Sequence, residues 1–129
     1  MTVEVGLSGS GAFTVGDADT ATALGSGDVP VLATPRLIAW SEAVTVRALD
    51  GHLANDATTV GTRVELDHLG ASAVGTDVTI DVVLSAVDGR NLRFDIHAWQ
   101  GERVPIGRGT VSRVLVDRER FLRRLRGED

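Results

Sequence analysis

The most constraining feature of this chain is a helix that is expected to begin at residue 34 and is apolar on more than one side. Thr34-Pro35 is a typical helix start, because a threonine oxygen caps the first turn and proline is tolerated at its first position. The segment ends at Asp50-Gly51, an ordinary helix end. Its apolar residues fill most of the helix surface: Leu37, Ile38, Ala39, Val44, Val46, Ala48 and Leu49. Such a helix must be buried, and in a chain of 129 residues only a sheet can wrap it.

The rest of the chain supplies that sheet. We expect a strand or a bent pair of strands at residues 2–16, broken at Gly9-Ser10-Gly11, and then a turn-rich connector at residues 17–33. Four segments after the helix show the apolar alternation of strands: residues 58–69, 76–87, 91–99 and 103–116. In the first of them the alternating apolar residues are Val60, Val64 and Leu66. A polar amphipathic tail follows at residues 117–126. Short turns such as Asp88-Gly89 favour antiparallel pairing. The sequence therefore predicts a single α+β domain, residues 1–129, in which an antiparallel sheet wraps a long central helix.

Composition excludes several classes of chemistry. The chain has no cysteine and no lysine, since all 13 basic residues are arginine, so disulfides, a cysteine nucleophile and a lysine Schiff base are excluded. A net charge of −5 argues against non-specific binding to nucleic acid. The three histidines lack the spacing of metal ligands, and no cofactor is expected. There is no apolar stretch of about 20 residues for a membrane span, and no secretion signal is seen, so we expect a cytoplasmic protein.

Three polar residues are candidates for chemistry. Glu42 lies on a largely apolar helix face, where a carboxylate either faces solvent at the edge of the apolar stripe or is held in an apolar site, as catalytic carboxylates are. His68 closes a strand, and Thr34 is explained as a helix cap, although its hydroxyl also lies where a developing anion is favoured. A threonine, a carboxylate and a histidine are a workable set for hydrolysis. His52 and His97 are interpreted as structural.

Taken together, several segments resemble the fluoroacetyl-CoA thioesterase-like branch of the hotdog superfamily. They are Ala23 to Pro35 with Glu42 eight residues after Thr34, Thr59 to Val64 leading to His68-Leu69, Gly107 to Arg113, and the ending Asp117 to Leu122. The resemblance covers Val3 to Leu122 and is specific, because the motifs occur in order and at the spacing of the family.

The resemblance implies a hotdog thioesterase that acts on acyl-CoA. It assigns a catalytic role to Thr34, Glu42 and His68, and contact with the thioester or its carrier to Gly61 and Arg113. It also implies a homodimer, with a dimer of dimers as the alternative, whose active sites lie at or near the subunit interface. Whether Glu42 and His68 meet within one subunit or across two is left open.

The chain departs from the family in two places. The family pattern Gly-Thr-His-x-Arg reads Gly109-Thr110-Val111-Ser112-Arg113 here, so valine replaces histidine. The connector from Asp19 to Ala33 has no aromatic residue from which a lid could be built. These departures favour a general short- or medium-chain acyl-CoA over fluoroacetyl-CoA as the substrate.

Alternatives remain at the level of mechanism and of function. Glu42 would either activate water or attack the thioester to form a mixed anhydride, His68 would move the proton, and Thr34 would hold the water or carbonyl or act as the nucleophile. A hotdog hydratase of enoyl thioesters would use a similar carboxylate and histidine. A non-catalytic acyl-CoA-binding domain is the other alternative, and the Val111 departure is its best support.

Overall fold

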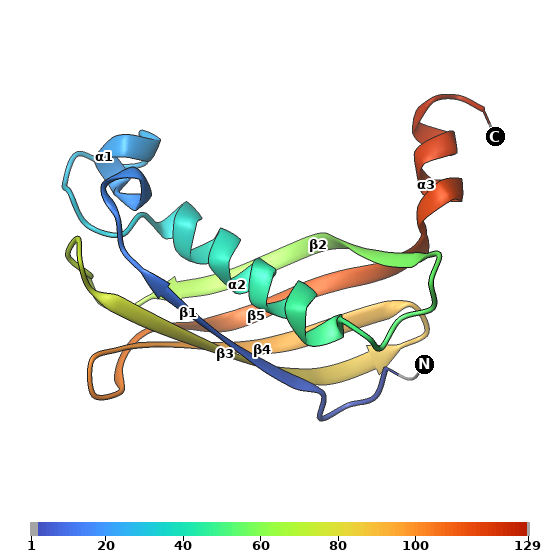
Figure 1. The fold of residues 1–129 in the computed structure, drawn as a ribbon, viewed down its shortest axis with the longest axis horizontal. Helices are drawn as coiled ribbons and strands as arrows, with labels where there is room; N and C mark the ends of the chain where they lie inside the picture. Colours follow the sequence, from blue (N-terminus) through green and yellow to red (C-terminus); the bar gives the residue numbers. More distant parts are fainter. Residues whose placement is uncertain (1–2, 129) are drawn as a thin grey trace.

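In the computed structural model, which describes residues 3–128, one long helix lies on the concave face of a five-stranded antiparallel sheet (Figure 1). The elements along the chain are β1 (Ser8–Thr14), a 3₁₀ turn η1 (Asp17–Asp19), α1 (Ala21–Leu24), α2 (Thr34–Leu49), β2 (Ala57–His68), β3 (Asp77–Asp88), β4 (Asn91–Gln100), β5 (Val104–Asp117) and α3 (Arg118–Leu125). The sheet order is β1-β3-β4-β5-β2. The expected α+β hotdog architecture is confirmed. Residues 1, 2 and 129, which the expected N-terminal strand and domain bounds include, lie outside the described residues.

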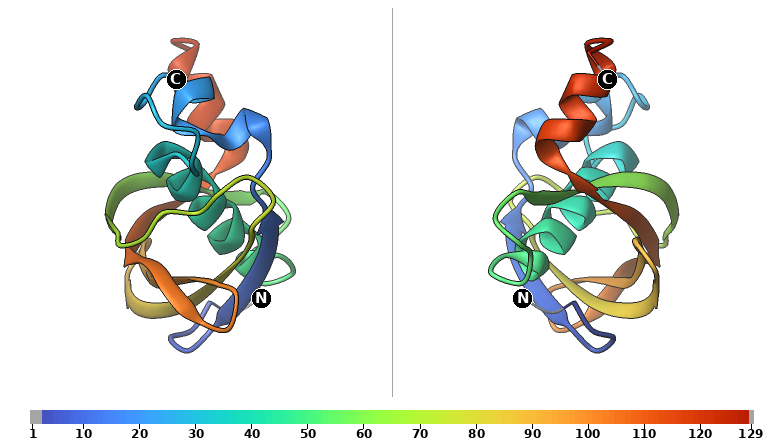
Figure 2. Two further views of the ribbon diagram at one scale, coloured as in Figure 1. Left: turned by 90° about the vertical axis from the view of Figure 1, so that its left-hand side faces the viewer. Right: turned by 90° about the vertical axis from the view of Figure 1, so that its right-hand side faces the viewer.

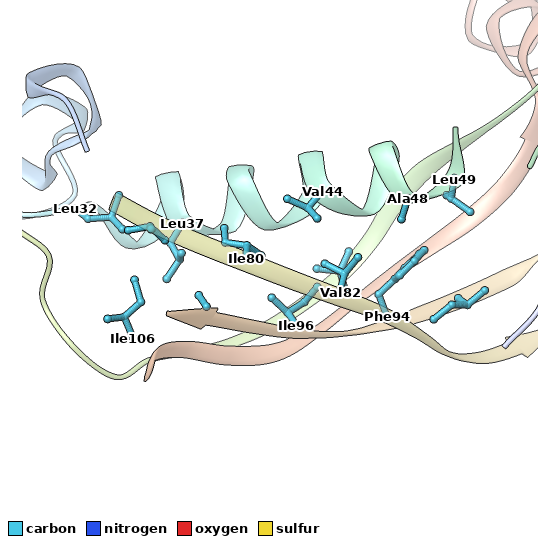
Figure 3. Packing of buried hydrophobic residues seen from close by; sticks show 14 of the residues in the cluster. Leu32, Leu37, Val44, Ala48, Leu49, Ile80, Val82, Phe94, Ile96 and Ile106 are labelled. Carbon is cyan, nitrogen blue, oxygen red and sulfur yellow. The ribbon is translucent and has the colours of Figure 1, made fainter. Parts of the chain in front are cut away.

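The hydrophobic core lies between α2 and the curved sheet. Seen from its ends, the sheet curls around α2, with β1 and β2 at its two edges (Figure 2). Fully or nearly fully buried side chains from the helix and from the strands meet in this space (Figure 3): Leu37, Val44, Ala48 and Leu49 from α2, and Ile80, Val82, Leu84, Phe94, Ile96, Ile106 and Val111 from the sheet. Their removal from water is the main force that holds helix and sheet together.

The opposite side of α2 is not covered by the part of the chain that the structure describes. Ala39 is exposed, and Val46 keeps 48% of its surface accessible. We expected the sheet to bury a helix that is apolar on more than one side, but a single curved layer covers only the side that faces it. An apolar strip of α2 therefore remains open in the isolated chain.

Two glycines of β1 allow that strand to approach α2 closely. A Cβ atom at Gly9 would lie 2.8 Å from Cβ of Ala48, and one at Gly11 would lie 2.7 Å from Cγ2 of Val44. The predicted break at residues 9–11 was wrong, because β1 runs through all three residues. Glycine serves here for close approach of backbone to helix rather than for a turn.

A β-bulge in β2 decides which side chains face the helix. The pairing of β2 with β5 shifts between Gly61 and Arg63, so that Gly61 pairs with Arg113 and Val64 with Val111. Because an extra residue reverses the alternation, Val64 packs against the core and Val60 does not, although the sequence pattern placed both on one face. The bulge also brings His68 to the same concave side as Gly61.

The predicted turns and ends agree with the structure. Asp88 pairs with Asn91 across the β3–β4 hairpin, and Gly89 adopts a φ of 60° there. Helix α2 ends at Leu49 with Asp50 as its C-cap. The polar tail forms α3, capped by the Asp117 carboxylate, which accepts a hydrogen bond from the backbone N–H of Arg120 at 3.0 Å, and α3 points away from the sheet (Figure 1).

We expect Gly9→Ala to lower the free energy of unfolding by about 1–3 kcal/mol, because the new methyl group overlaps Ala48 and pushes β1 off the helix. Urea unfolding of the variant measures this loss. Ala12→Val, at an exposed position of the same strand, is the matched control and should change stability little. Equal stability of Gly9→Ala and the wild type would contradict the role assigned to Gly9.

Candidate active site

Thr34 does not cap the helix that it begins. The N-cap of α2 is Ala33, which makes no side-chain cap, and Pro35 follows Thr34 inside the first turn. The prediction that Thr34 is the N-cap was therefore wrong, because the N-cap is the preceding residue, Ala33. Its hydroxyl oxygen instead lies 2.7 Å from Nδ1 of His68, at the far end of β2. The helix start thus presents a hydroxyl group to an imidazole.

The connector before α2 holds Thr34 in place through main-chain bonds. The backbone N–H of Leu32 donates to the carbonyl of Ser72 at 2.9 Å, and that of Ala33 donates to the carbonyl of Asp19 at 2.9 Å. These bonds fasten the residues just before Thr34 to two other segments of the chain. The position of the hydroxyl is consequently set by rigid backbone on both sides of it.

His68 occupies a partly buried position that favours the neutral imidazole. It is the last residue of β2 and pairs with Gly107 of β5. Burial lowers the pKa of His68, and a hydrogen-bonding interaction with the backbone of Gly70 opposes this only in part. A neutral ring whose Nδ1 carries the lone pair can accept the proton of the Thr34 hydroxyl.

Thr34 and His68 border a surface hollow of about 390 Å³. The other residues that line it have small or aliphatic side chains: Ala21, Ser26, Gly27, Val29, Val31, Leu32, Leu69, Gly70 and Ala71. No aromatic side chain is among the lining residues in the described part of the chain. The hollow therefore offers an uncharged and mainly apolar surface beside the hydroxyl–imidazole pair.

Glu42 belongs to a second polar group in the middle of α2. Its carboxylate Oε2 lies 3.3 Å from Nη1 of Arg113, and its side chain is 36% exposed. The carboxylate passes over Gly61, where a Cβ atom would lie only 2.5 Å from Oε2. A side chain at residue 61 would therefore displace the Glu42 carboxylate from this position.

Arg113 is buried beneath this carboxylate. Only 7% of the residue is exposed, and its guanidinium donates to the Thr59 hydroxyl at 2.8 Å, to the Thr59 carbonyl at 3.2 Å and to Glu42. Burial lowers the pKa of Arg113, while the charge of Glu42 and the hydrogen bond to it act in the opposite direction. Sequence reasoning missed Thr59, since a strand threonine has no distinguishing pattern and only the pairing of β2 with β5 brings it to Arg113.

Within one chain the three expected catalytic residues form two groups. Thr34 and Glu42 are eight residues apart on α2, which separates them by about 12 Å along the helix axis. Among the described residues, neither Thr34 nor His68 makes a hydrogen bond or ion pair with Glu42. Thr34 contacts His68 at one end of the helix, while Glu42 contacts Arg113 further along.

Val111, at the position where the family pattern has histidine, is part of the hydrophobic core. Its side chain is fully buried, and its strand partners are Val64 on β2 and Phe94 on β4. A valine is well accommodated there because its neighbours are apolar. The substitution leaves both polar groups of the candidate site intact.

The other candidates do not add chemistry. His97 lies on the exposed face of β4, where its ring stacks with that of Trp99 at a centroid distance of 6.0 Å. Among residues 3–128, no cluster of three or more metal-ligating side chains is present. None of the helices in this part of the chain is long and apolar enough to cross a membrane.

The chain is similar in sequence and in fold to known proteins. A family model described as fluoroacetyl-CoA-specific thioesterase matches residues 15–119. The fluoroacetyl-CoA thioesterase of Streptantibioticus cattleyicolor is 31% identical over 96 residues, which are 74% of this chain and 68% of that protein. A solved structure of a fluoroacetyl-CoA thioesterase has a TM-score of 0.90 at 27% identity and covers 100% of this chain and 99% of its own. A variant of such an enzyme, solved with fluoroacetate and CoA, has a TM-score of 0.85 at 28% identity over 92% of this chain and 99% of its own.

We expect an NMR titration to place the midpoint of His68 below the ordinary histidine value of 6.5, because burial disfavours the charged ring. The imidazole signal of His68 is assigned by its loss in His68→Gln. A midpoint above 6.5 would show that the site does not favour the neutral ring and would contradict the environment assigned to His68.

Proposed function

The chain belongs to the fluoroacetyl-CoA-specific thioesterase family, and from that premise we propose that it hydrolyses an acyl-CoA thioester to the free acid and CoA. The observation that carries this proposal is the 2.7 Å contact between the Thr34 hydroxyl and Nδ1 of His68 at the edge of an apolar hollow. A hydroxyl next to a neutral imidazole is the arrangement required to generate an oxygen nucleophile. We expect the enzyme to work in the cytoplasm.

The hollow supports a short- or medium-chain acyl group as the substrate. Its lining of small and aliphatic side chains suits an uncharged hydrocarbon chain better than a charged or strongly polar one. The absence of an aromatic residue from the connector removes the bulky groups that would otherwise narrow it. Fluoroacetyl-CoA is accordingly not expected to be preferred.

In the proposed reaction, His68 accepts a proton as an oxygen attacks the thioester carbonyl, whether that oxygen belongs to Thr34 or to a water that Thr34 holds. The carbonyl oxygen becomes negatively charged, and the start of α2 is a favourable place for that charge because the helix dipole is positive there. When the tetrahedral intermediate collapses, the carbon–sulfur bond breaks and the proton passes to the CoA thiolate. If water attacked, the free acid is formed in this step; if Thr34 attacked, a water then cleaves the acyl-Thr34 ester, which releases the free acid and returns the proton to the Thr34 oxygen.

Glu42 supplies the carboxylate that completes the set. Its partial exposure lets water and substrate reach it, and Arg113 holds it above Gly61. Glu42 would orient or deprotonate water for hydrolysis. Gly61 and Arg113 would contact the bound thioester.

We propose further that the active site is completed by a second copy of the chain. Strand β2 is 12 residues long and, among residues 3–128, pairs only with β5, so in this part of the chain its other edge has unpaired main-chain groups. Antiparallel pairing of two β2 edges about a two-fold axis places the His68 end of one strand beside the Gly61 half of the other. The Thr34–His68 pair of one subunit would then face Glu42 of the partner subunit, which removes the separation of the two groups within a chain. A homodimer is therefore the smallest active unit that we propose.

The decisive experiment is thiol release from a panel of acyl-CoAs by the wild type, Glu42→Gln and His68→Ala. We expect release by the wild type and a loss of roughly 10²- to 10⁴-fold in each variant, as for removal of a general base. Exposed Glu65→Gln is the matched control and should retain activity. Binding of acyl-CoA by folded protein without thiol release would contradict hydrolysis and favour a binding domain, and hydration of an enoyl-CoA would favour a hydratase.

Mixing the two inactive variants tests the proposed dimer. If Glu42 and His68 act across the interface, hybrid dimers of Glu42→Gln and His68→Ala contain one intact site, and re-equilibrated mixtures should recover about a quarter of wild-type activity. If both residues act within one subunit, every site in the mixture carries a defect and no activity returns. A monomer in sedimentation measurements of the active protein would also contradict the proposal.

A further inference from the structure

Arg113 is held at one edge of its guanidinium by a single residue of the neighbouring strand. Thr59 accepts from Nε through its hydroxyl at 2.8 Å and from Nη2 through its backbone carbonyl at 3.2 Å. Two parallel bonds of this kind fix a planar guanidinium both in position and in rotation. The remaining nitrogen, Nη1, is then directed at the carboxylate of Glu42, 3.3 Å away.

The burial of Arg113 makes this orientation depend on Thr59. The arginine side chain is only 8% exposed, so water is not readily available to replace a missing acceptor. A buried donor without a partner is costly, and the group tends to turn until the donor finds one. Without the Thr59 hydroxyl, Nε loses its partner and the rotation of the guanidinium is no longer fixed from both sides.

The bulge in β2 places Thr59 on the correct face for this contact. Thr59 and Gly61 are two residues apart on the same side of the bulge, so both point to the concave face. Gly61 pairs directly with Arg113, and its missing side chain leaves the room in which Arg113 and Glu42 meet, since a Cβ there would lie 2.5 Å from Oε2 of Glu42. Arg113 therefore reaches diagonally back along β2 to Thr59.

We infer that Thr59 is a positioning residue, which acts through Arg113 to aim the Glu42 carboxylate, and this inference rests on the proposed role of Glu42. Hydrogen bonds connect half-buried Thr59 to the buried guanidinium of Arg113, and Arg113 to the carboxylate of Glu42. The Glu42 side chain is 36% exposed, so substrate can reach it. The hydroxyl of Thr59 touches Arg113 and not the reacting atoms. Its removal should therefore impair the chemical step more than the binding of substrate.

The test compares Thr59→Val, which removes only the hydroxyl from a residue of the same shape, with Thr59→Ser, which keeps it. We expect Thr59→Val to lower kcat by roughly 10- to 100-fold with KM little changed, because a misaimed catalytic group slows the chemical step. Thr59→Ser should remain within a few-fold of the wild type. Thr79→Val, an exposed strand threonine on β3, is the matched control for the substitution itself.

The same experiment separates this inference from the proposed function. In a Glu42→Gln background, Thr59→Val should cause no further loss, since the group that it positions has already been removed. Wild-type kcat in Thr59→Val, beside an inactive Glu42→Gln, overturns the inference alone, as does equal loss in Thr59→Val and Thr59→Ser. Full activity of Glu42→Gln overturns the role of Glu42 itself. If Thr59→Val unfolds at the assay temperature, Thr59→Ala, with thermal unfolding measured beside kcat, provides the same comparison.

Discussion

The burial of one side of α2 against the sheet is the interaction on which the rest of this structure depends. It fixes both ends of the helix relative to the strands, and so it carries Thr34 to His68 at one end and Glu42 to Arg113 in the middle. The contact is close because Gly9 and Gly11 let β1 lie directly against the helix. Hydrophobic packing thereby sets the geometry of both polar groups, Thr34 with His68 and Glu42 with Arg113, although the packed side chains take no part in the reaction.

The polar groups are arranged by irregularities of the sheet. A bulge in β2 turns Thr59, Gly61 and His68 to the same concave face, and the glycine at position 61 leaves space for the Glu42 carboxylate. Here a side chain is absent where the carboxylate of Glu42 lies.

The edge position of β2 and the open side of α2 both favour association with a second copy of the chain. Unpaired main-chain groups and an uncovered apolar strip, to which Val46 belongs, are both features that a second copy of the chain would cover. The separation of Glu42 from the Thr34–His68 pair within one chain gives such a dimer a chemical reason as well. Assembly and catalysis would then depend on the same strand edge.

The sequence by itself determined the elements and the candidates. Apolar periodicity located α2 and the four strands after it, turn residues located their ends, and the resemblance named Thr34, Glu42 and His68. It did not determine the close approach at Gly9 and Gly11, the reversal of alternation after Gly61, or the partnership of Arg113 with Thr59 and Glu42. Those features depend on contacts between residues far apart in the chain, whereas propensity and periodicity report only on neighbours. Only the tertiary structure could therefore decide that the Thr34 hydroxyl meets His68 instead of capping its helix.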